Sequence, residues 1–152
     1  MKSFLFLTTL LVILSACDSP RNHRVESGGG TSGESMVSLQ SFKNSDLKIS
    51  AKWLVGPHPV VNKPSTLIVY IYNSEGNLVS LPDGEQINFY ASMVSMGHGL
   101  DQPGYFTEIS PGIFLNTEIS FNMSGDWSME LWLQDADYNI KDKIVWPDFL
   151  QP

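Results

Sequence analysis

The chain has 152 residues, a formal net charge of −7 at pH 7 and one cysteine. This acidity argues against a nucleic-acid-binding protein, which needs a basic face. It also argues against docking onto anionic lipid through a basic patch. A single cysteine rules out an intramolecular disulfide, so a folded domain of this chain must be held together by packing.

The N-terminus has the regions of a secretory signal peptide. Lys2 precedes an uncharged, largely apolar run from Phe4 to Leu14, which is too short to span a bilayer. The LSAC sequence that follows resembles the lipobox of bacterial lipoproteins, and this resemblance implies that Cys17 becomes the lipid-modified first residue of the mature chain. We expect residues 1–16 to be removed and the lipid to hold the protein on the extracytoplasmic side of a cell-envelope membrane. An ordinary signal peptide with a chance cysteine is the alternative.

A polar segment separates this leader from the rest of the chain. Residues 18–36 contain almost no apolar side chains and include a glycine triplet among serines, a composition typical of a flexible tether. We therefore divide the chain into a signal peptide (1–16), a lipidated cysteine with its tether (17–41) and one folded domain (42–152).

The folded domain shows the apolar–polar alternation that is typical of β-strands, and no helical period persists for three turns. Short strands with regularly spaced turn signals indicate an all-β fold, an immunoglobulin-like β-sandwich of about seven antiparallel strands. The paired cysteines of antibody domains are absent. We expect the strands at residues 47–54, 65–72, 85–93, 104–110, 114–123, 127–134 and 140–146.

The same alternation predicts which side chains face the core. It places Gln134 outward, and it also places Tyr138, Trp132 and Trp146 outward, where these three aromatic residues would form a patch that binds a partner or closes the sandwich. The predicted inward residues are Ile49, Ala51 and Trp53; Ile87, Phe89, Ala91 and Met93; Leu115, Thr117, Ile119, Phe121 and Met123; and Trp127, Met129, Leu131 and Leu133.

Residues 91–100, ASMVSMGHGL, contain the donors of a soft-metal site. Thioether sulfur and imidazole nitrogen favour copper over magnesium, calcium or manganese. Met96 and His98 are two residues apart, so both would project from the same face of an extended chain. The glycines on either side of the histidine allow the backbone to turn sharply there. The sequence therefore predicts a copper site at Met96 and His98.

Each of these residues also has a structural interpretation. Methionine is a common core filler, and alternation directs Met93 into the core. Met93 could act as a weaker third ligand only if its strand bulges or ends before Met96. A lone histidine in a glycine-rich loop is commonly just solvated. His58, in a proline-bounded loop, is another candidate third ligand.

The segments MVSMGHG and PGYFTEISPGIFLNTEISFNMSGDWSMELWL look like the FixH/YtkA-like group of bacterial extracytoplasmic domains. The resemblance covers about residues 65–135 and implies an immunoglobulin-like fold and a link to copper handling. Val94-Ser95 departs from the usual Met-Pro, and FixH proteins have a transmembrane helix instead of a lipobox, so a role in oxidase assembly is not carried over. The matching residues are Met93, Met96, Gly97, His98 and Gly99; Gly104 and Tyr105 or Gly112 and Phe114; and Met123, Gly125 and Trp127.

Enzymatic activity is not expected, because the sequence has no G-x-S-x-G elbow, no H-E-x-x-H motif and no cysteine nucleophile after lipidation. The acidic DADYN segment at residues 135–139 lacks the glycine and glutamate of an EF-hand loop and favours a hairpin turn. Two functions remain open. One is a membrane-anchored lipoprotein that binds or delivers copper, and the other is a metal-free module that docks onto another cell-envelope protein.

Overall fold

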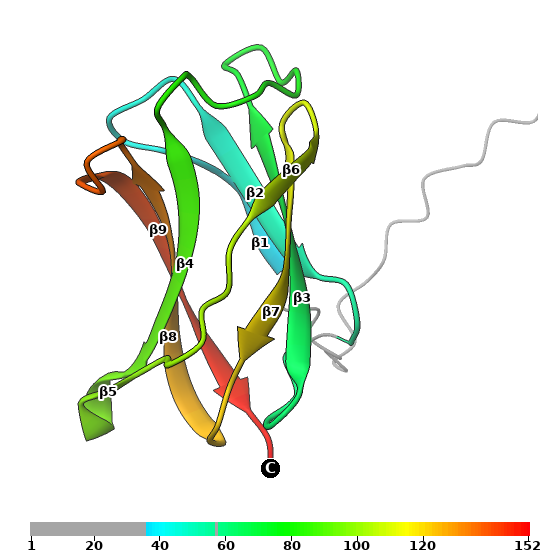
Figure 1. Cartoon of the computed structure of the whole chain (residues 1–152), viewed down its shortest axis with the longest axis vertical. Helices are drawn as coiled ribbons and strands as arrows, with labels where there is room; N and C mark the ends of the chain where they lie inside the picture. Colours follow the sequence, from blue (N-terminus) through cyan, green and yellow to red (C-terminus); the bar gives the residue numbers. More distant parts are fainter. Residues whose placement is uncertain (1–35, 57) are drawn as a thin grey trace, which may run out of the picture. The chain divides into compact units, whose positions relative to one another are not determined.

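The computed structural model describes residues 36–56 and 58–152, and no helix within these ranges is long and apolar enough to cross a membrane. The described residues form two antiparallel sheets that face each other (Figure 1). The all-β sandwich predicted from the sequence is confirmed. One sheet has the order β1 (Met36–Ser41), β2 (Lys48–Trp53), β3 (Pro64–Tyr72), β7 (Ile113–Ser120) and β6 (Thr107–Ser110); the other has the order β5 (His98–Gly99), β4 (Gln86–Met93), β8 (Gly125–Gln134) and β9 (Ile140–Leu150).

The first strand begins inside the range that the sequence assigned to the tether. β1 pairs with β2, and Val37 lies opposite Ala51 with only 4% of its surface exposed. The folded part therefore includes residues 36–41, and the expected boundary at residue 42 lies too late. β1 gave no sequence signal because Leu39 is exposed and the register shifts between Val37 and Gln40, so alternation does not hold along it.

The inward faces predicted for β2, β4 and β8 are confirmed. Their apolar residues are all at most 6% exposed, and edge-to-face aromatic contacts join the two sheets at ring-centroid separations of 5.1–6.3 Å. Such contacts add to the free energy gained by burying the rings. The aromatic residues in this cluster are Trp53, Phe89, Phe121 and Trp127.

The inward face predicted for β7 is wrong over its first half. Phe114 and Asn116 are buried there, whereas Thr117 is exposed and Leu115 is half-buried. Between the pairs Ser65–Ile119 and Leu67–Asn116, β7 has one residue more than β3, as in a β-bulge. An inserted residue reverses which side chains face inward, so a single alternation cannot describe the whole strand.

β9 is an edge strand with an unusual inward face. Asp142 and Asp148 point inward and are 7% exposed, and Trp146 lies on the same face with its ring centroid 6.2 Å from that of Phe89. The expected outward patch of three aromatic residues is therefore not formed, since Trp146 packs against the core and Tyr138 lies in the β8–β9 turn.

Candidate functional site

The chain between β4 and β5 makes a tight turn. A short 3-10 helix, η1 (Val94–Met96), is followed by Gly97 in the left-handed region at φ 61° and ψ 27°. Glycine adopts this conformation without the steric penalty of other residues. Because η1 is not extended, the expectation that Met96 and His98 project from one face of a strand is wrong. Met96 lies at the outer part of the turn with 62% of its surface exposed, and His98 returns beside β4.

Met93 occupies a core position, as alternation predicted. It is 5% exposed, and it pairs directly opposite His98 across the β4–β5 ladder. Directly opposite side chains in an antiparallel pair lie on the same face of the sheet, so His98 also faces the inner side, at its edge. The thioether of Met93 is enclosed by the core, unlike that of Met96.

The His98 imidazole is half-buried and has defined neighbours. Its ring lies 6.3 Å from the buried Trp127 ring at an interplanar angle of 67°. The Asn122 side-chain nitrogen is 3.4 Å from His98 Nε2 and 3.3 Å from an oxygen of Asp101. A carboxylate only accepts hydrogen bonds, so the NH₂ group of Asn122 donates one hydrogen to Asp101 and the other to Nε2. This assignment leaves the lone pair on His98 Nε2 and the proton on Nδ1.

Met96 lines a surface hollow of about 520 Å³, and a second methionine, Met123, lines it too. The sequence placed Met123 among the inward residues, and although β7 ends before it, at Ser120, Met123 is partly buried and packs against the core. Its carbonyl accepts a hydrogen bond of 3.2 Å from Trp127 Nε1, which fixes the backbone there. The residues around the hollow are Val61, Asn62, Met96, Asn122, Met123, Ser124 and Pro152.

His58 lies near this hollow but is held elsewhere. Its Nδ1 is 2.6 Å from an oxygen of Asp148, whose side chain is 2% exposed. The ring borders a separate hollow of about 260 Å³, which shares only Pro152 with the hollow at Met96. The expectation that His58 supplies a third ligand beside Met96 is therefore not supported by its position. In the described part of the chain, no three or more His, Cys, Asp or Glu side chains gather as a metal-binding group.

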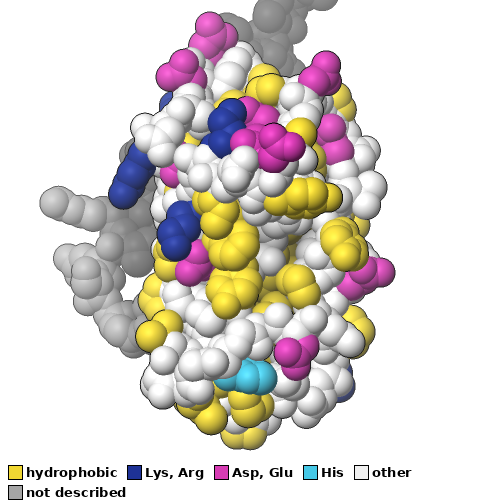
Figure 2. All heavy atoms as spheres, turned by 60° about the vertical axis from the view of Figure 1, so that its left-hand side comes forward, with side chains coloured by type: hydrophobic (Ala, Val, Ile, Leu, Met, Phe, Trp, Pro, Cys, Tyr) yellow, Lys and Arg dark blue, Asp and Glu magenta, His cyan; other side chains and the backbone are white. Residues whose placement is uncertain are grey.

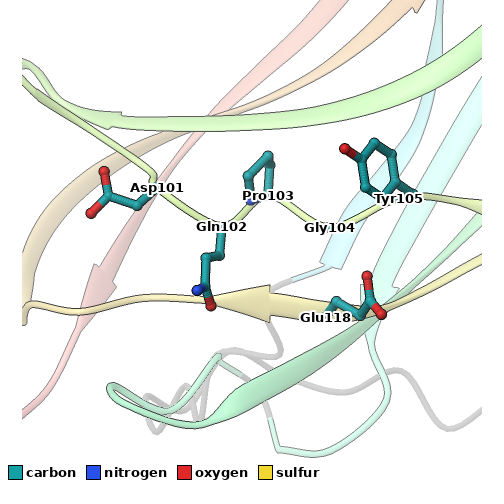
Figure 3. A pocket seen from close by; sticks show the side chains of 6 residues that line it. All are labelled: Asp101, Gln102, Pro103, Gly104, Tyr105 and Glu118. Carbon is teal, nitrogen blue, oxygen red and sulfur yellow. The ribbon is translucent and has the colours of Figure 1, made fainter.

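A third hollow, of about 340 Å³, follows the segment between β5 and β6 (Figure 3). Two of its lining residues are acidic, but Figure 3 shows the side chain of Asp101 directed away from Glu118. The buried Asn116 fixes this segment by donating a 2.8 Å hydrogen bond to the Pro103 carbonyl and accepting one of 3.1 Å from the Glu118 N–H. The two carboxylates do not converge, so they do not form a cation site. We interpret this hollow as a surface feature of the segment that connects the two sheets.

The outward face of the four-stranded sheet carries a stacked aromatic pair. Tyr90 and Trp132 lie 4.8 Å apart between ring centroids at 25°, and the exposed Val145, which pairs with Glu130 on β8, lies on the same face. Figure 2, which brings forward the side where β4 and β9 lie, shows hydrophobic side chains in a band with lysines at one border. Partial burial alone would raise the pKa of Glu130, but hydrogen bonds from Lys143 and Trp132 and the charge of Lys143 outweigh it and lower that pKa.

The DADYN segment forms the β8–β9 hairpin turn that the sequence favoured. The Asp135 carboxylate accepts hydrogen bonds from the backbone N–H groups of residues 137 and 139 and from the Asn139 side chain. The backbone bond from Asn139, followed by its side-chain bond, lowers the pKa of Asp135. Gln134 stays on the outward face of β8, as predicted, where it pairs with Gln86 and bonds to Asn88, but it is only 6% exposed because the turn covers it and it donates to the Tyr138 carbonyl at 2.9 Å.

The lipidation site predicted at Cys17, the signal peptide and residues 17–35 of the tether lie outside the described residues. Met96, His98 and Met123 thus remain the soft donors that the described part of the sandwich brings to one end. No protein-family model, curated protein or solved structure matches this chain, so the likeness to FixH/YtkA-like domains rests on the motif residues alone.

Proposed function

We propose that this protein is a membrane-anchored extracytoplasmic lipoprotein that binds or delivers copper through Met96 and His98. Cys17 would carry the lipid anchor, and the polar tether would let the sandwich reach away from the membrane. The likeness of the MVSMGHG segment to FixH/YtkA-like domains supports the choice of copper, since that group has been linked with copper handling.

The single observation that carries the proposal is the donor set at the β4–β5 turn. His98 Nε2 accepts a hydrogen bond, so its lone pair is available to a metal once Asn122 moves, and the Met96 thioether is exposed beside the same asparagine. An imidazole and a thioether together suit copper better than hard cations such as magnesium or calcium. The Trp127 indole lies edge-on to the His98 ring, so Trp127 fluorescence should change when a metal ion binds His98.

A copper titration tests the proposal. The full-length protein, purified in detergent, is titrated anaerobically with Cu(I) against a chromophoric chelator while Trp fluorescence is followed. We expect uptake of about one ion per chain with fluorescence quenching, and loss of both in the Met96→Leu, His98→Ala double variant. Met129→Leu is the matched control, because Met129 is a fully buried thioether on β8. Equally poor uptake by the wild type and the double variant would reject copper binding.

The second candidate function is a metal-free module that docks onto another cell-envelope protein. The stacked Tyr90–Trp132 pair beside Val145 favours it, since apolar groups displayed on a sheet face are typical of protein contacts. Cross-linking in the native envelope separates the two functions. A cross-linked partner that is lost on Trp132→Ser but retained in the Met96→Leu, His98→Ala variant would favour the docking module.

A further inference from the structure

We infer that the site selects monovalent copper and that Met123 is its third donor, next to Met96 and His98. This inference rests on the proposed copper function and extends it to the oxidation state and the ligand set. The spacing of residues 91–100 could not reveal this ligand set, because Met123 lies 27 positions after Met96.

The first observation is that both methionines line one hollow. Met96 reaches it from η1, and Met123 reaches it from the segment that connects β7 to β8. The side chains around this hollow provide two thioethers, two amides and one hydroxyl, and none is a carboxylate or an imidazole. A cation in the hollow therefore has two soft sulfur donors, and the oxygen donors of the lining side chains are neutral.

The second observation is that His98 adjoins the hollow through Asn122. Asn122 lines the hollow, and its amide nitrogen lies 3.4 Å from His98 Nε2. A metal ion that binds Nε2 must replace this hydrogen bond, which is long and lies on an exposed side chain, so little stability is lost. Two thioethers and one imidazole would then surround the ion.

The ligand chemistry decides the oxidation state. Thioethers are soft ligands that select Cu(I), whereas Cu(II) prefers square-planar or tetragonal nitrogen and oxygen ligands. The carboxylate of Asp101 accepts a hydrogen bond from the same Asn122 amide group, so Asp101 is the hard donor that competes with the two thioethers at this site. Two sulfur donors and one nitrogen donor form a softer ligand set than the nitrogen and oxygen ligands that Cu(II) prefers. Silver(I) shares the softness of Cu(I) and serves as a probe that does not undergo redox change.

The test compares three forms of the full-length protein in detergent: the wild type, Met123→Leu and Met129→Leu. Competition titrations measure the affinity of each form for Cu(I), Ag(I) and Cu(II). We expect Met123→Leu to weaken Cu(I) and Ag(I) binding at least roughly tenfold, since even outer partners of metal ligands are worth this much. Binding of Cu(II) should be weaker than that of Cu(I) and unchanged by this variant. Met129→Leu is the matched control, because Met129 is a fully buried thioether on β8 that should not contribute.

The outcomes are distinguishable. If the wild type binds Cu(I) and Met123→Leu binds it equally well, the third donor is wrong while the copper function stands. Tighter binding of Cu(II) than of Cu(I) by the wild type would overturn the selectivity. If the wild type binds none of the three ions, the proposed function itself fails. If Met123→Leu unfolds, X-ray absorption on the copper-loaded wild type replaces the titration. Two sulfur neighbours per copper ion would support the inference, and one would overturn it.

Discussion

The terminal methyl group of Met93 fills the space beside Gly125. A Cβ atom at residue 125 would lie 2.6 Å from Met93 Cε, and the backbone φ of Gly125 is 130°, which residues with side chains rarely adopt. This contact joins the end of β4 to the start of β8. Because η1 begins at the next residue after Met93, the packing of the core and the placement of Met96 depend on the same contact.

Gly125→Ala should therefore destabilise the domain strongly. The φ of 130° strains any residue that has a side chain, and the added methyl group must displace the flexible end of Met93, so the free energy of unfolding should fall by roughly 1–3 kcal/mol. Urea denaturation followed by Trp fluorescence measures this change. Gly76→Ala is the control, since Gly76 also has a positive φ but a Cβ added there would meet no atom within 4 Å. Equal losses in the two variants would contradict the importance of the Met93 contact.

The stability contributed by Glu130 should depend on pH. Its pKa is lowered in the folded state from the ordinary value of 4.5, because the bonds from Lys143 and Trp132 outweigh burial. A lowered folded pKa gives stability that is present above pH 4.5 and is lost as the pH falls through the folded pKa. Glu130→Gln should thus cost about 0.5–1 kcal/mol at pH 7 and less below pH 4.5. Thermal unfolding from pH 3 to pH 8 checks this, and a difference that stays constant with pH would contradict it. Glu75→Gln, at an exposed position, is the control.

His58 and Asp148 should show measurable coupling. The pair links the β2–β3 connection to β9 at 2.6 Å, with the carboxylate buried and the ring half-exposed. A double-mutant cycle with His58→Ala and Asp148→Asn should give an interaction free energy of roughly 1–2 kcal/mol at pH 6. Single and double variants are compared by urea midpoints. Free energies that add within about 0.3 kcal/mol would show that the contact contributes nothing.

Cys17→Ser should release the protein from the membrane. The residues around Cys17 resemble a lipobox, so the wild-type chain should lose residues 1–16 and carry acyl chains on the cysteine. Intact-mass measurement and detergent phase separation check both points. The serine variant should lack the lipid mass and enter the aqueous phase. Wild-type protein that partitions into water as the variant does would reject lipidation.

The sequence predicted the architecture well where alternation is uninterrupted. β2, β4 and β8 bury the residues that a period of two selects. The prediction failed where the backbone departs from a regular strand: at the bulge on β7, where Asn116 turns inward, and in η1, a helical turn that ends at Met96 and replaces the expected extended backbone. These departures depend on pairing with other strands, so local pattern does not reveal them.

The sequence could predict only two of the candidate site residues, because the others depend on how distant segments pack together. Met96 and His98 could be selected from donor softness and nearness in sequence. Met123 and Asn122 could not, because they come from the β7–β8 connection and reach the site only when the two sheets fold together. Met123 was predicted to be a core residue, and it does pack against the core, but alternation gave no sign that it also lines the hollow beyond the end of β7.

The inward carboxylates of β9 should affect whether separate copies of the protein associate through this strand. β9 is eleven residues long and lies at the open edge of its sheet, where a strand from a second copy could add. Pro147 lacks the N–H that such a ladder needs, and Asp142 and Asp148 are already bonded to Asn44 and His58. At high concentration, copies of the protein should therefore not join through β9 into fibres.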